Sequence, residues 1–324
     1  MSFRVVATTI MMCLCTFSAH AENAAPGPQY PNKPITLIVG YSPGGSNDVV
    51  ARLLARELQK RMGQPVVVEN RPSTGAIVGA IATANAKPDG YTLMIAASGP
   101  IVINPAVYKK LPYSPQKNFD PISLVATFPL VLSVKGDAPI KSAKELIAYT
   151  KAHPNQANYS ASSSAFQLAS ELLKERTGMV AQHIPYKGSN DSAMAVASGE
   201  VTFSLLDPGP AAGAIRGGLI RGIAVTSAER MSVYPEIPTL KEQGIDMQIG
   251  FWIGLFAPAG TPPTIIKRLE QETATAISNV DMAKDMTQMG LIPTSSSPEE
   301  FAQQIGDEIA MWSALAKQNN ISVE

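Results

Sequence analysis

Short runs of Val, Ile and Leu alternate along the chain with stretches whose apolar residues recur every three or four positions. A compact β-branched run bounded by turn residues predicts a strand, and the wider apolar spacing predicts an amphipathic helix. The predicted strands span residues 35–39, 66–68, 92–96, 122–126, 130–134, 180–184, 201–206, 222–226 and 251–256. Because strands and helices alternate, the pattern predicts an α/β chain with mostly parallel sheets.

Helix boundaries can be predicted from cap residues. Apolar residues recur at four-residue spacing within 48–62, and Gly63 follows as a helix stop. A Ser or Thr that precedes a proline, or that precedes a Glu by three positions, favours a helix start. Three further starts are predicted in this way, at Ser142 with Glu145, at Thr261-Pro262 and at Ser297-Pro298.

The length of the chain, 324 residues, is more than one core usually organises, so two domains are expected. Stretches 112–121 and 234–250 are interrupted by Pro and Gly. If the chain leaves one domain near residues 112–121 and returns to it near residues 234–250, the other domain is an insertion into the first one. We therefore predict one lobe of residues 22–127 plus 250–324 and another of residues 128–249. Two crossings would form a hinge, and clefts between domains are preferred ligand sites.

The N-terminus has the pattern of a secretory signal peptide. Arg4 precedes a short apolar run over 5–17, and Ala19-His20-Ala21 matches a cleavage site. The run is too short for the alternative, a membrane-spanning anchor. We predict a signal peptide of residues 1–21, cleavage after Ala21 and a periplasmic protein. Both cysteines lie in this segment, so the mature chain has no disulfide to support it.

Charge and composition limit the kinds of partner and cofactor that the protein is expected to bind. The chain has 26 Lys and Arg residues and 26 Asp and Glu residues. It therefore has no surplus of basic residues that would indicate nucleic-acid binding. Beyond the leader, no run approaches the ~18 apolar residues of a membrane span. No His, Cys, Asp and Glu cluster has metal-ligand spacing, and no dinucleotide or P-loop fingerprint is present. We expect a monomer with no cofactor, no metal and no embedding in a membrane.

The most informative segment is 35–48, ITLIVGYSPGGSND, in which a strand, a glycine loop and a helix start follow one another. Glycines let the backbone approach a ligand, and the unpaired N–H groups of a helix start attract an anion. The alternative is an ordinary tight turn. Asp48 complements the helix dipole but repels an anion unless it caps locally or meets a donor of the ligand. The residues expected at the ligand are Ser42, Pro43, Gly44, Gly45 and Asp48.

The same segment also matches G-x-S-x-G, the pattern of a serine hydrolase with Ser42 as nucleophile. In such an enzyme the next residue donates its backbone N–H to the oxyanion, but Pro43 has no N–H. His153 and His183 are the only histidines available as a base in the mature chain, and His153 lies at a predicted helix end. The chemistry therefore argues against hydrolysis, and we expect no enzymatic activity.

Three other sites offer polar groups beside predicted strands or turns. Ser98-Gly99 follows strand 92–96, and Asp207 ends strand 201–206. Ligands of open α/β sheets collect at such carboxyl ends, although a strand-end aspartate more often caps the next turn. Lys187 lies beside a glycine turn and could attract a carboxylate, although an exposed lysine is the commoner fate.

A serine-rich stretch, YSASSSAFQL, is the second loop candidate. Its Ser162, Ser163 and Ser164 precede a helical pattern, so their hydroxyls and the N–H groups of the helix start could hold a ligand oxygen. The structural alternative is a capping box between Ser164 and Gln167. Phe166 could form an apolar wall of the cleft, as could Phe128 and Trp252, although burial in a core is the commoner place for each.

Motifs along nearly the whole mature chain resemble those of the Bug family, the TctC-like extracytoplasmic solute receptors of tripartite tricarboxylate transporters. The resemblance rests on SPGGSND, GQPVVVENRPSTGAIVGA, KPDGYTLMIA, NPAVYKKLPYSP, HIPYKGS, AVTSAERMSVYPEIPTLKEQG and GLFAPAGTP. It implies a type II periplasmic-binding-protein fold with two lobes, a two-strand hinge and an interdomain cleft. It also implies a small carboxylate ligand (a di- or tricarboxylate, an acidic amino acid or an aromatic acid) and inner-membrane transporter subunits as partners.

In the family, the Pro-Gly-Gly loop and the serine-rich loop of the other lobe hold the carboxylate. This maps onto Ser42, Pro43, Gly44, Gly45 and Asp48, and then onto Ser98 and the run 162–164. Asp207 corresponds to an acidic position near the cleft. The chain departs from the family pattern at Phe166 and Gln167, where a histidine commonly follows a glycine-rich loop, and at Pro208, where Asn is common. Those departures suggest an aromatic or longer acid. A periplasmic sensor that feeds a signalling kinase would use the same cleft and remains an alternative.

Overall fold

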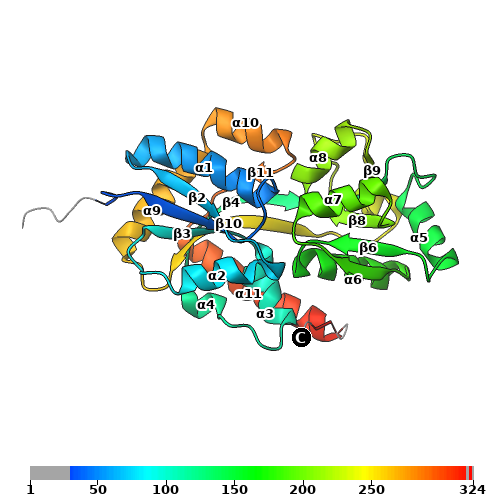
Figure 1. Cartoon of the computed structure of the whole chain (residues 1–324), viewed down its shortest axis with the longest axis horizontal. Coiled ribbons are helices and arrows are strands. Elements are labelled where there is room, and N and C mark those ends of the chain that lie inside the picture. Colours follow the sequence, from blue (N-terminus) through cyan, green and yellow to red (C-terminus); the bar gives the residue numbers. More distant parts are fainter. Residues whose placement is uncertain (1–29, 319–320, 323–324) are drawn as a thin grey trace, which may run out of the picture.

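The computed structural model describes residues 30–318 and 321–322. Helices flank two β-sheets (Figure 1). The first sheet has the order β11-β4-β10-β3-β1-β2. Its strands are β1 (Ile35–Val39), β2 (Val66–Asn70), β3 (Thr92–Ala97), β4 (Phe119–Pro129), β10 (Gly250–Pro258) and β11 (Ile292–Pro293).

The second sheet has the order β7-β6-β8-β5-β9. Its strands are β5 (Val131–Lys135), β6 (Asn158–Ala161), β7 (Gln182–Pro185), β8 (Phe203–Leu206) and β9 (Ile220–Val225). Each predicted strand overlaps one of the observed strands. The additional strands β6 and β11 have four and two residues, too few to give a periodic signal.

The prediction of mostly parallel sheets is wrong, because both sheets are mixed. β1 pairs in parallel with β2 and β3, and β6 pairs in parallel with β7 and β8. The other ladders, which involve β4, β5, β9, β10 and β11, are antiparallel. Apart from the short ladder of β11, each antiparallel ladder contains β5 or β10, the strands that follow the two connections between the sheets. A chain that leaves a sheet through one strand and returns through the neighbouring strand runs in the opposite direction.

The two connections between the sheets lie side by side. One is Leu130, between β4 and β5, and the other covers 226–249, between β9 and β10. Leu130 N–H donates to Thr226 Oγ1 over 2.8 Å, and Thr226 Oγ1 donates to Ile249 O over 2.7 Å. Backbone hydrogen bonds from Thr226 to Leu130 and from Ile249 to Thr226 complete the link. A single buried threonine thus joins both connections.

Helices cover both faces of the first sheet, with α1 and α10 above it and α2 and α11 below it in Figure 1. The helices of this part are α1 (Ser46–Met62), η1 (Thr74–Ala76), α2 (Ile77–Ala84), η2 (Gly99–Ile103), α3 (Asn104–Val107), α4 (Pro115–Asn118), α9 (Pro263–Ile277), α10 (Val280–Gln288) and α11 (Pro298–Gln318). The second sheet is accompanied by α5 (Ala143–Ala152), α6 (Ser164–Thr177), α7 (Ser189–Ser198), α8 (Pro208–Arg216) and the short η3 (Lys241–Gln243).

Two of the three predicted caps are confirmed. Ser142 Oγ accepts from Glu145 N–H at the start of α5, and Ser297 and Glu300 bond reciprocally at the start of α11. The prediction at Thr261 is wrong, because α9 begins one residue later than expected, after Pro262. Thr261 Oγ1 instead donates to Pro258 O over 2.7 Å and so serves the preceding turn.

The aromatic residues divide between the core and the pocket described below. Trp252 is buried among Phe256 and Phe301 and donates from Nε1 to Glu308, so it belongs to the core. Phe128 and Phe166, for which the core was the commoner expectation, both reach the pocket lining. The sequence pattern could not separate these positions, because all three rings are largely buried.

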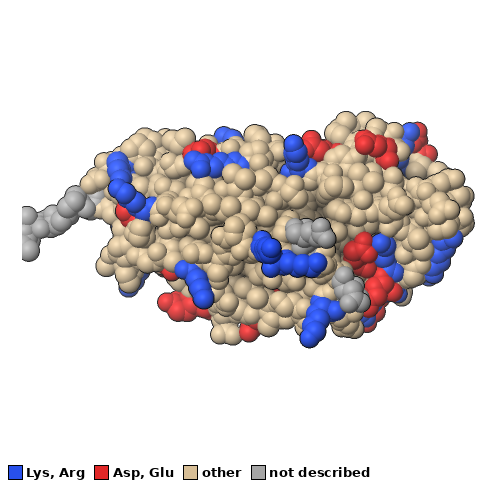
Figure 2. Space-filling model, turned by 60° about the horizontal axis from the view of Figure 1, so that its bottom comes forward, with Lys and Arg blue, Asp and Glu red and all other residues tan. Residues whose placement is uncertain are grey.

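Figure 2 shows both basic and acidic residues spread over this face of the molecule, some of them in small groups, with uncharged surface between them. Over residues 30–318 and 321–322, no helix is long and apolar enough to cross a membrane. The same residues contain no group of three or more His, Cys, Asp and Glu side chains that could hold a metal ion. The predicted signal peptide lies outside the described residues.

Candidate functional site

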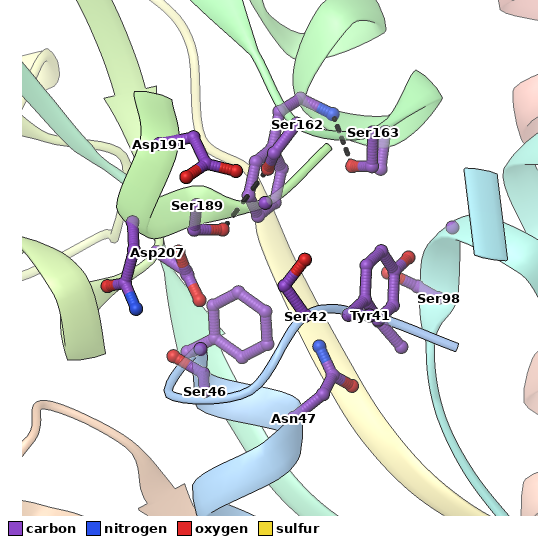
Figure 3. Close-up of a pocket in the computed structure, with 18 of the residues that line it drawn as sticks. Tyr41, Ser42, Ser46, Asn47, Ser98, Ser162, Ser163, Ser189, Asp191 and Asp207 are labelled. Atoms are coloured by element: carbon purple, nitrogen blue, oxygen red, sulfur yellow. Dashed lines mark hydrogen bonds between the residues drawn. The ribbon is translucent and has the colours of Figure 1, made fainter. Parts of the chain in front are cut away.

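A pocket opens where loops of the two sheets meet (Figure 3). It measures about 70 Å³, and one water needs roughly 10–15 Å³ of such a cavity, so a small organic molecule fits its size. Most of its lining follows the carboxyl ends of strands, where open α/β sheets bind ligands. The main lining segments are 41–43 and 45–47 after β1, 97–99 at the end of β3, 162–163 and 165–166 after β6, 188–191 after β7 and Asp207 after β8.

The loop between β1 and α1 is held in shape by Asp48. Gly44 has a φ of 84°, and its N–H donates to Asp48 Oδ2 over 2.9 Å. Arg52 binds both carboxylate oxygens, over 3.0 and 2.9 Å, and Asn70 Nδ2 donates to Oδ1 over 2.9 Å. Burial opposes ionisation, but the hydrogen bonds from Arg52, Gly44 and Asn70 hold the pKa of Asp48 below its ordinary value. Asp48 is therefore an ionised support of the loop.

The loop between β7 and α7 repeats the tetrapeptide that starts α1. Gly-Ser-Asn-Asp occupies both 45–48 and 188–191, and in each copy the glycine is the N-cap. The two loops touch across the pocket. A methyl group added at Gly44 would lie 3.0 Å from Asn190 Nδ2, and one added at Gly188 would lie 3.4 Å from Ser42 Cβ.

The serines of the β6–α6 loop have three different roles. Ser162 Oγ lies 3.1 Å from Ser189 Oγ, the contact drawn in Figure 3. Ser163 is the N-cap of α6 and accepts from Phe166 N–H over 3.4 Å. Ser164 turns away from the pocket and donates to Asn104 Oδ1 over 2.5 Å, which ties α6 to α3 of the first sheet's layer. The alternative of a capping box between Ser164 and Gln167 is wrong by one residue, because the cap is Ser163.

Several buried polar atoms of the lining have no partner among the described residues. They are Ser46 Oγ, Asn47 Oδ1, Ser98 Oγ and Asp207 Oδ1. Ser46, Ser98 and Asp207 each have only 2% of their surface exposed. An unpaired buried polar group is costly, and such groups are rare in folded proteins. Four of the ten such atoms in the described part of the chain surround this one pocket, where a polar ligand would satisfy them.

Asp207 has the most unusual surroundings in the pocket. Burial raises the pKa of Asp207, and polar groups of Ser46 and Ser189 near its carboxylate lower the pKa only in part. These groups lie close to the carboxylate, but none of them forms a hydrogen bond with Oδ1. Figure 3 shows its carboxylate between these two serines. Asp207 is the N-cap residue of α8, but its side chain makes no capping hydrogen bond there. The structural alternative, an aspartate that caps the next helix, is therefore not observed.

The N-termini of three helices converge on this pocket from both sheets. α1 contributes Gly45 and Ser46, α6 contributes Ser163, and α7 contributes Gly188 and Ser189. Each helix is at least ten residues long. The first N–H groups of a helix have no partner within it and carry a partial positive charge. This arrangement favours an anionic group in the pocket.

Most of the predicted binding residues line the pocket, namely Ser42, Pro43, Gly45, Ser98, Gly99, Ser162, Ser163, Phe166 and Asp207. Gly44, Asp48, Ser164 and Lys187 are not among the lining residues. Asp48 occupies the Gly44 N–H, Ser164 is bonded to Asn104, and Lys187 is exposed to solvent. The sequence analysis missed Tyr41, Ser46, Asn47, Ser189, Asn190 and Asp191. The repeated Gly-Ser-Asn-Asp was the signal that could have indicated most of these residues.

Neither described histidine is placed to activate Ser42 as a hydrolase would require. His153 is exposed and stacks on Tyr149, with ring centroids 4.5 Å apart. His183 stacks on Tyr159 at 5.2 Å, and burial lowers its pKa. Neither histidine is in the pocket lining.

Comparison with known proteins places this chain in a family. A family model described as the tripartite tricarboxylate transporter family receptor, TctC, matches residues 50–321. Protein BugT of Bordetella pertussis is 33% identical over 323 residues, which cover 98% of this chain and 99% of BugT.

Two solved structures extend the likeness to the fold. The periplasmic binding protein BugD has a TM-score of 0.87 at 29% identity, over 91% of this chain and 100% of BugD. MatC from Rhodopseudomonas palustris, with bound malate, has a TM-score of 0.84 at 29% identity, over 88% of this chain and 99% of MatC. The predicted α/β periplasmic-binding-protein fold and the resemblance to Bug proteins are thereby confirmed. The chain belongs to the TctC family, the solute receptors of tripartite tricarboxylate transporters.

Proposed function

We propose that the protein captures a small organic carboxylate in the pocket between its two sheets, in the periplasm, and delivers it to the membrane subunits of a tripartite tricarboxylate transporter. One observation carries the choice of a carboxylate: the N-termini of α1, α6 and α7 meet at a pocket whose lining contains no Lys, Arg or His. Oriented N–H groups can stabilise an anion without a cationic side chain. The malate in MatC is an example of such a ligand in a relative.

The proposed grip uses groups from both sheets. Ser42, Gly45 and Ser98 come from the first sheet's loops, and Ser163 and Ser189 come from the second sheet's loops. A ligand that contacts both sets only when they are close together favours the closed arrangement over an open one. We therefore divide the chain into two lobes, 22–127 plus 250–324 and 128–249, which open about Leu130 and Thr226. The closed form would be the one that docks on the transporter.

The test is a thermal-shift and calorimetric screen of the exported protein, unfolded and refolded beforehand to remove any co-purified ligand. Its panel pairs mono-, di- and tricarboxylates, including aromatic acids, with the corresponding primary amides. A carboxylate at a hundred times its Kd should add about 2.7 kcal/mol of stability, and its amide should add much less. Equal shifts by acids and amides would overturn the choice of a carboxylate. A fall in the radius of gyration on binding, measured by X-ray scattering, would support closure.

Ser98→Ala separates a binding role of this hydroxyl from a structural one. Because Ser98 Oγ is buried without a partner in the described chain, its removal should leave the ligand-free protein equally or more stable, by up to about 1 kcal/mol. The affinity for the carboxylate should fall about tenfold. Ser204→Ala is the matched control, because Ser204 Oγ donates to Ser160 O and lies outside the pocket lining. It should lower stability and leave affinity unchanged.

A further inference from the structure

A buried hydrogen bond outside the pocket joins the layers of the two sheets. Ser164, the first residue of α6 in the second sheet's layer, donates from Oγ to Oδ1 of Asn104, the first residue of α3 in the first sheet's layer, over 2.5 Å. Asn104 has none of its surface exposed, and Ser164 has 7%. Neither residue is in the pocket lining, so a ligand in the pocket does not compete for this bond.

The orientation of the Asn104 amide is fixed by its other partners. Nδ2 donates to Gly75 O over 2.8 Å and to Tyr113 Oη over 3.1 Å, and the Tyr113 hydroxyl in turn donates to Pro100 O. A carbonyl oxygen can only accept a hydrogen bond, so the amide nitrogen must face Gly75 and the amide oxygen must face Ser164. Because these other partners belong to the first sheet's layer, that layer presents Asn104 Oδ1 to α6 as a firmly held acceptor.

The Ser164 hydroxyl is not needed by its own helix. The N-cap of α6 is Ser163, which accepts from Phe166 N–H. The other buried serine of this helix, Ser170, donates to Phe166 O over 2.8 Å and so bonds within α6. Ser164 differs from both serines, because its hydrogen bond leaves the helix and reaches the other layer.

We propose that Ser164 and Asn104 form a latch that stabilises the closed arrangement of the two lobes whether or not a ligand is bound. This inference rests on the proposed function, because it requires the lobes to open and close. When the lobes separate, water can bond to both groups, so the latch favours the closed form by the net stability of one buried hydrogen bond. The apparent affinity of a ligand is proportional to the fraction of molecules in the binding-competent form. The latch therefore raises the affinity for every ligand by a common factor and adds no selectivity.

An empty pocket has the opposite effect on closure. Among the described residues, Ser46 Oγ, Ser98 Oγ and Asp207 Oδ1 are buried in the closed arrangement without a hydrogen-bond partner. Buried polar groups that lack a partner destabilise the form in which they occur. The latch offsets part of this cost. Because the two contributions have opposite signs, the removal of one hydrogen bond should change the closed fraction of the ligand-free protein measurably.

The test measures the distance between the lobes in the refolded, ligand-free protein by double electron–electron resonance. Both natural cysteines lie in the predicted signal peptide, so Val78→Cys and Val180→Cys provide a unique pair of spin-label sites. Val78, on α2, and Val180, after α6, are 51% and 47% exposed. Ser164→Ala leaves Asn104 Oδ1 buried without a donor in the closed form alone, so the ratio of closed to open molecules should fall about threefold to tenfold. Ser170→Ala, the matched control on the same helix, should leave this ratio unchanged.

Calorimetry separates a latch from a ligand contact. With the carboxylates that bind in the screen, L-malate and adipate first, Ser164→Ala should lower each affinity by the same factor, no larger than the fall in the ratio of closed to open molecules. Factors that differ more than threefold between ligands would place Ser164 at the ligand and overturn the latch. If Ser164→Ala does not fold, Tyr113→Phe is the second test, because it removes one of the two acceptors that hold Asn104 Nδ2. It should lower the ratio about twofold to threefold.

The latch and the carboxylate function can fail separately. An unchanged ratio in the variant that folds, or a ligand-free natural protein that is entirely open, would overturn the latch. If no carboxylate binds while Ser164→Ala opens the ligand-free protein, the carboxylate function fails and the latch stands. If carboxylates bind and Ser164→Ala leaves the ratio unchanged, the carboxylate function stands and the latch fails.

Discussion

The tetrapeptide Gly-Ser-Asn-Asp starts α1 at 45–48 and α7 at 188–191, and the two copies face each other across the pocket. In the first copy the aspartate is 3% exposed and bound by Gly44, Arg52 and Asn70. In the second copy the aspartate is exposed, and no ion pair to it occurs in the described chain. The same four residues therefore produce a rigid, internally neutralised loop in one place and an uncompensated charge in the other.

The difference originates outside the tetrapeptide. The first copy is followed four residues later by arginine and lies beside Asn70 of the neighbouring strand β2, while the second is followed by alanine. Local sequence is thus enough to start a helix with a glycine N-cap in both copies. The charge that each copy presents to the pocket depends on the residue one helical turn later and on the neighbouring strand. The following predictions test this contrast, from the largest expected effect to the smallest.

The largest difference should come from Asp48→Ala and Asp191→Ala. Removal of the Asp48 carboxylate leaves three donors without their acceptor, so we expect a loss of about 2–4 kcal/mol in the free energy of unfolding. Because the loop loses its shape, carboxylate affinity should fall at least 100-fold. Asp191→Ala should change stability by less than about 0.5 kcal/mol. Urea unfolding and calorimetry measure both, and equal stability losses would refute the contrast.

The glycines of the first loop should also differ from each other. Gly44 has a φ of 84°, and an added Cβ would lie 3.0 Å from Asn190, so Gly44→Ser should cost about 1–2 kcal/mol and weaken binding. Gly45 has a φ of −78°, and an added Cβ would lie 3.8 Å from Ser42 O, an ordinary contact. Since serine is a favoured N-cap, Gly45→Ser should be tolerated within about 0.5 kcal/mol. Thermal unfolding of both variants measures the difference in their stability. If glycine is needed at these positions only for chain flexibility, the two variants should lose the same stability.

The pH dependence of stability should have opposite signs at Asp48 and Asp207. The pKa of Asp48 is lowered by folding, so its contribution is present above the ordinary carboxyl pKa of about 4 and is lost as the pH falls below it. The pKa of Asp207 is raised, so its burial costs stability at pH 7, and this cost disappears as the pH falls towards 4.

Asp48→Asn should therefore destabilise the ligand-free protein at pH 7, and Asp207→Asn should stabilise it by about 1–2 kcal/mol. Both differences should shrink towards zero below pH 4. Urea unfolding of the ligand-free variants at pH 7 and pH 3.5 checks the signs. Destabilisation by Asp207→Asn at pH 7 would show that an unrecognised partner already compensates this carboxylate.

The smallest effect should come from Arg52. Its side chain is half exposed, so its ion pair with Asp48 is partly screened by solvent. Arg52→Gln should lower stability by about 1 kcal/mol and reduce carboxylate affinity only a few-fold, because Gly44 and Asn70 still bind Asp48. The measurement is again urea unfolding with calorimetry. An effect as large as that of Asp48→Ala would mean that Arg52 acts directly on the ligand.

The sequence by itself determined nine of the eleven strands and several helix starts of the described chain, because hydrophobic spacing and capping residues are local properties. It also located the SPGGSND loop, Ser98, the serine-rich loop and Asp207 as strand-end candidates, and its motifs identified the family. These predictions depend on residues that are close together in the chain. The start of α9 was predicted one residue too early, because Thr261 bonds to Pro258 O in the preceding turn and does not cap the helix.

Only the tertiary structure decided which of the candidate groups line the pocket. Asp48 and Ser164 lie directly beside lining residues in the sequence, but they bond to Asn70 and Asn104, which are far away in the chain, and do not line the pocket. Phe128 and Phe166 line the pocket although both rings are buried, because the two sheets meet there and enclose a cavity. Whether a polar atom is paired depends on long-range packing, and local patterns carry no information about such contacts.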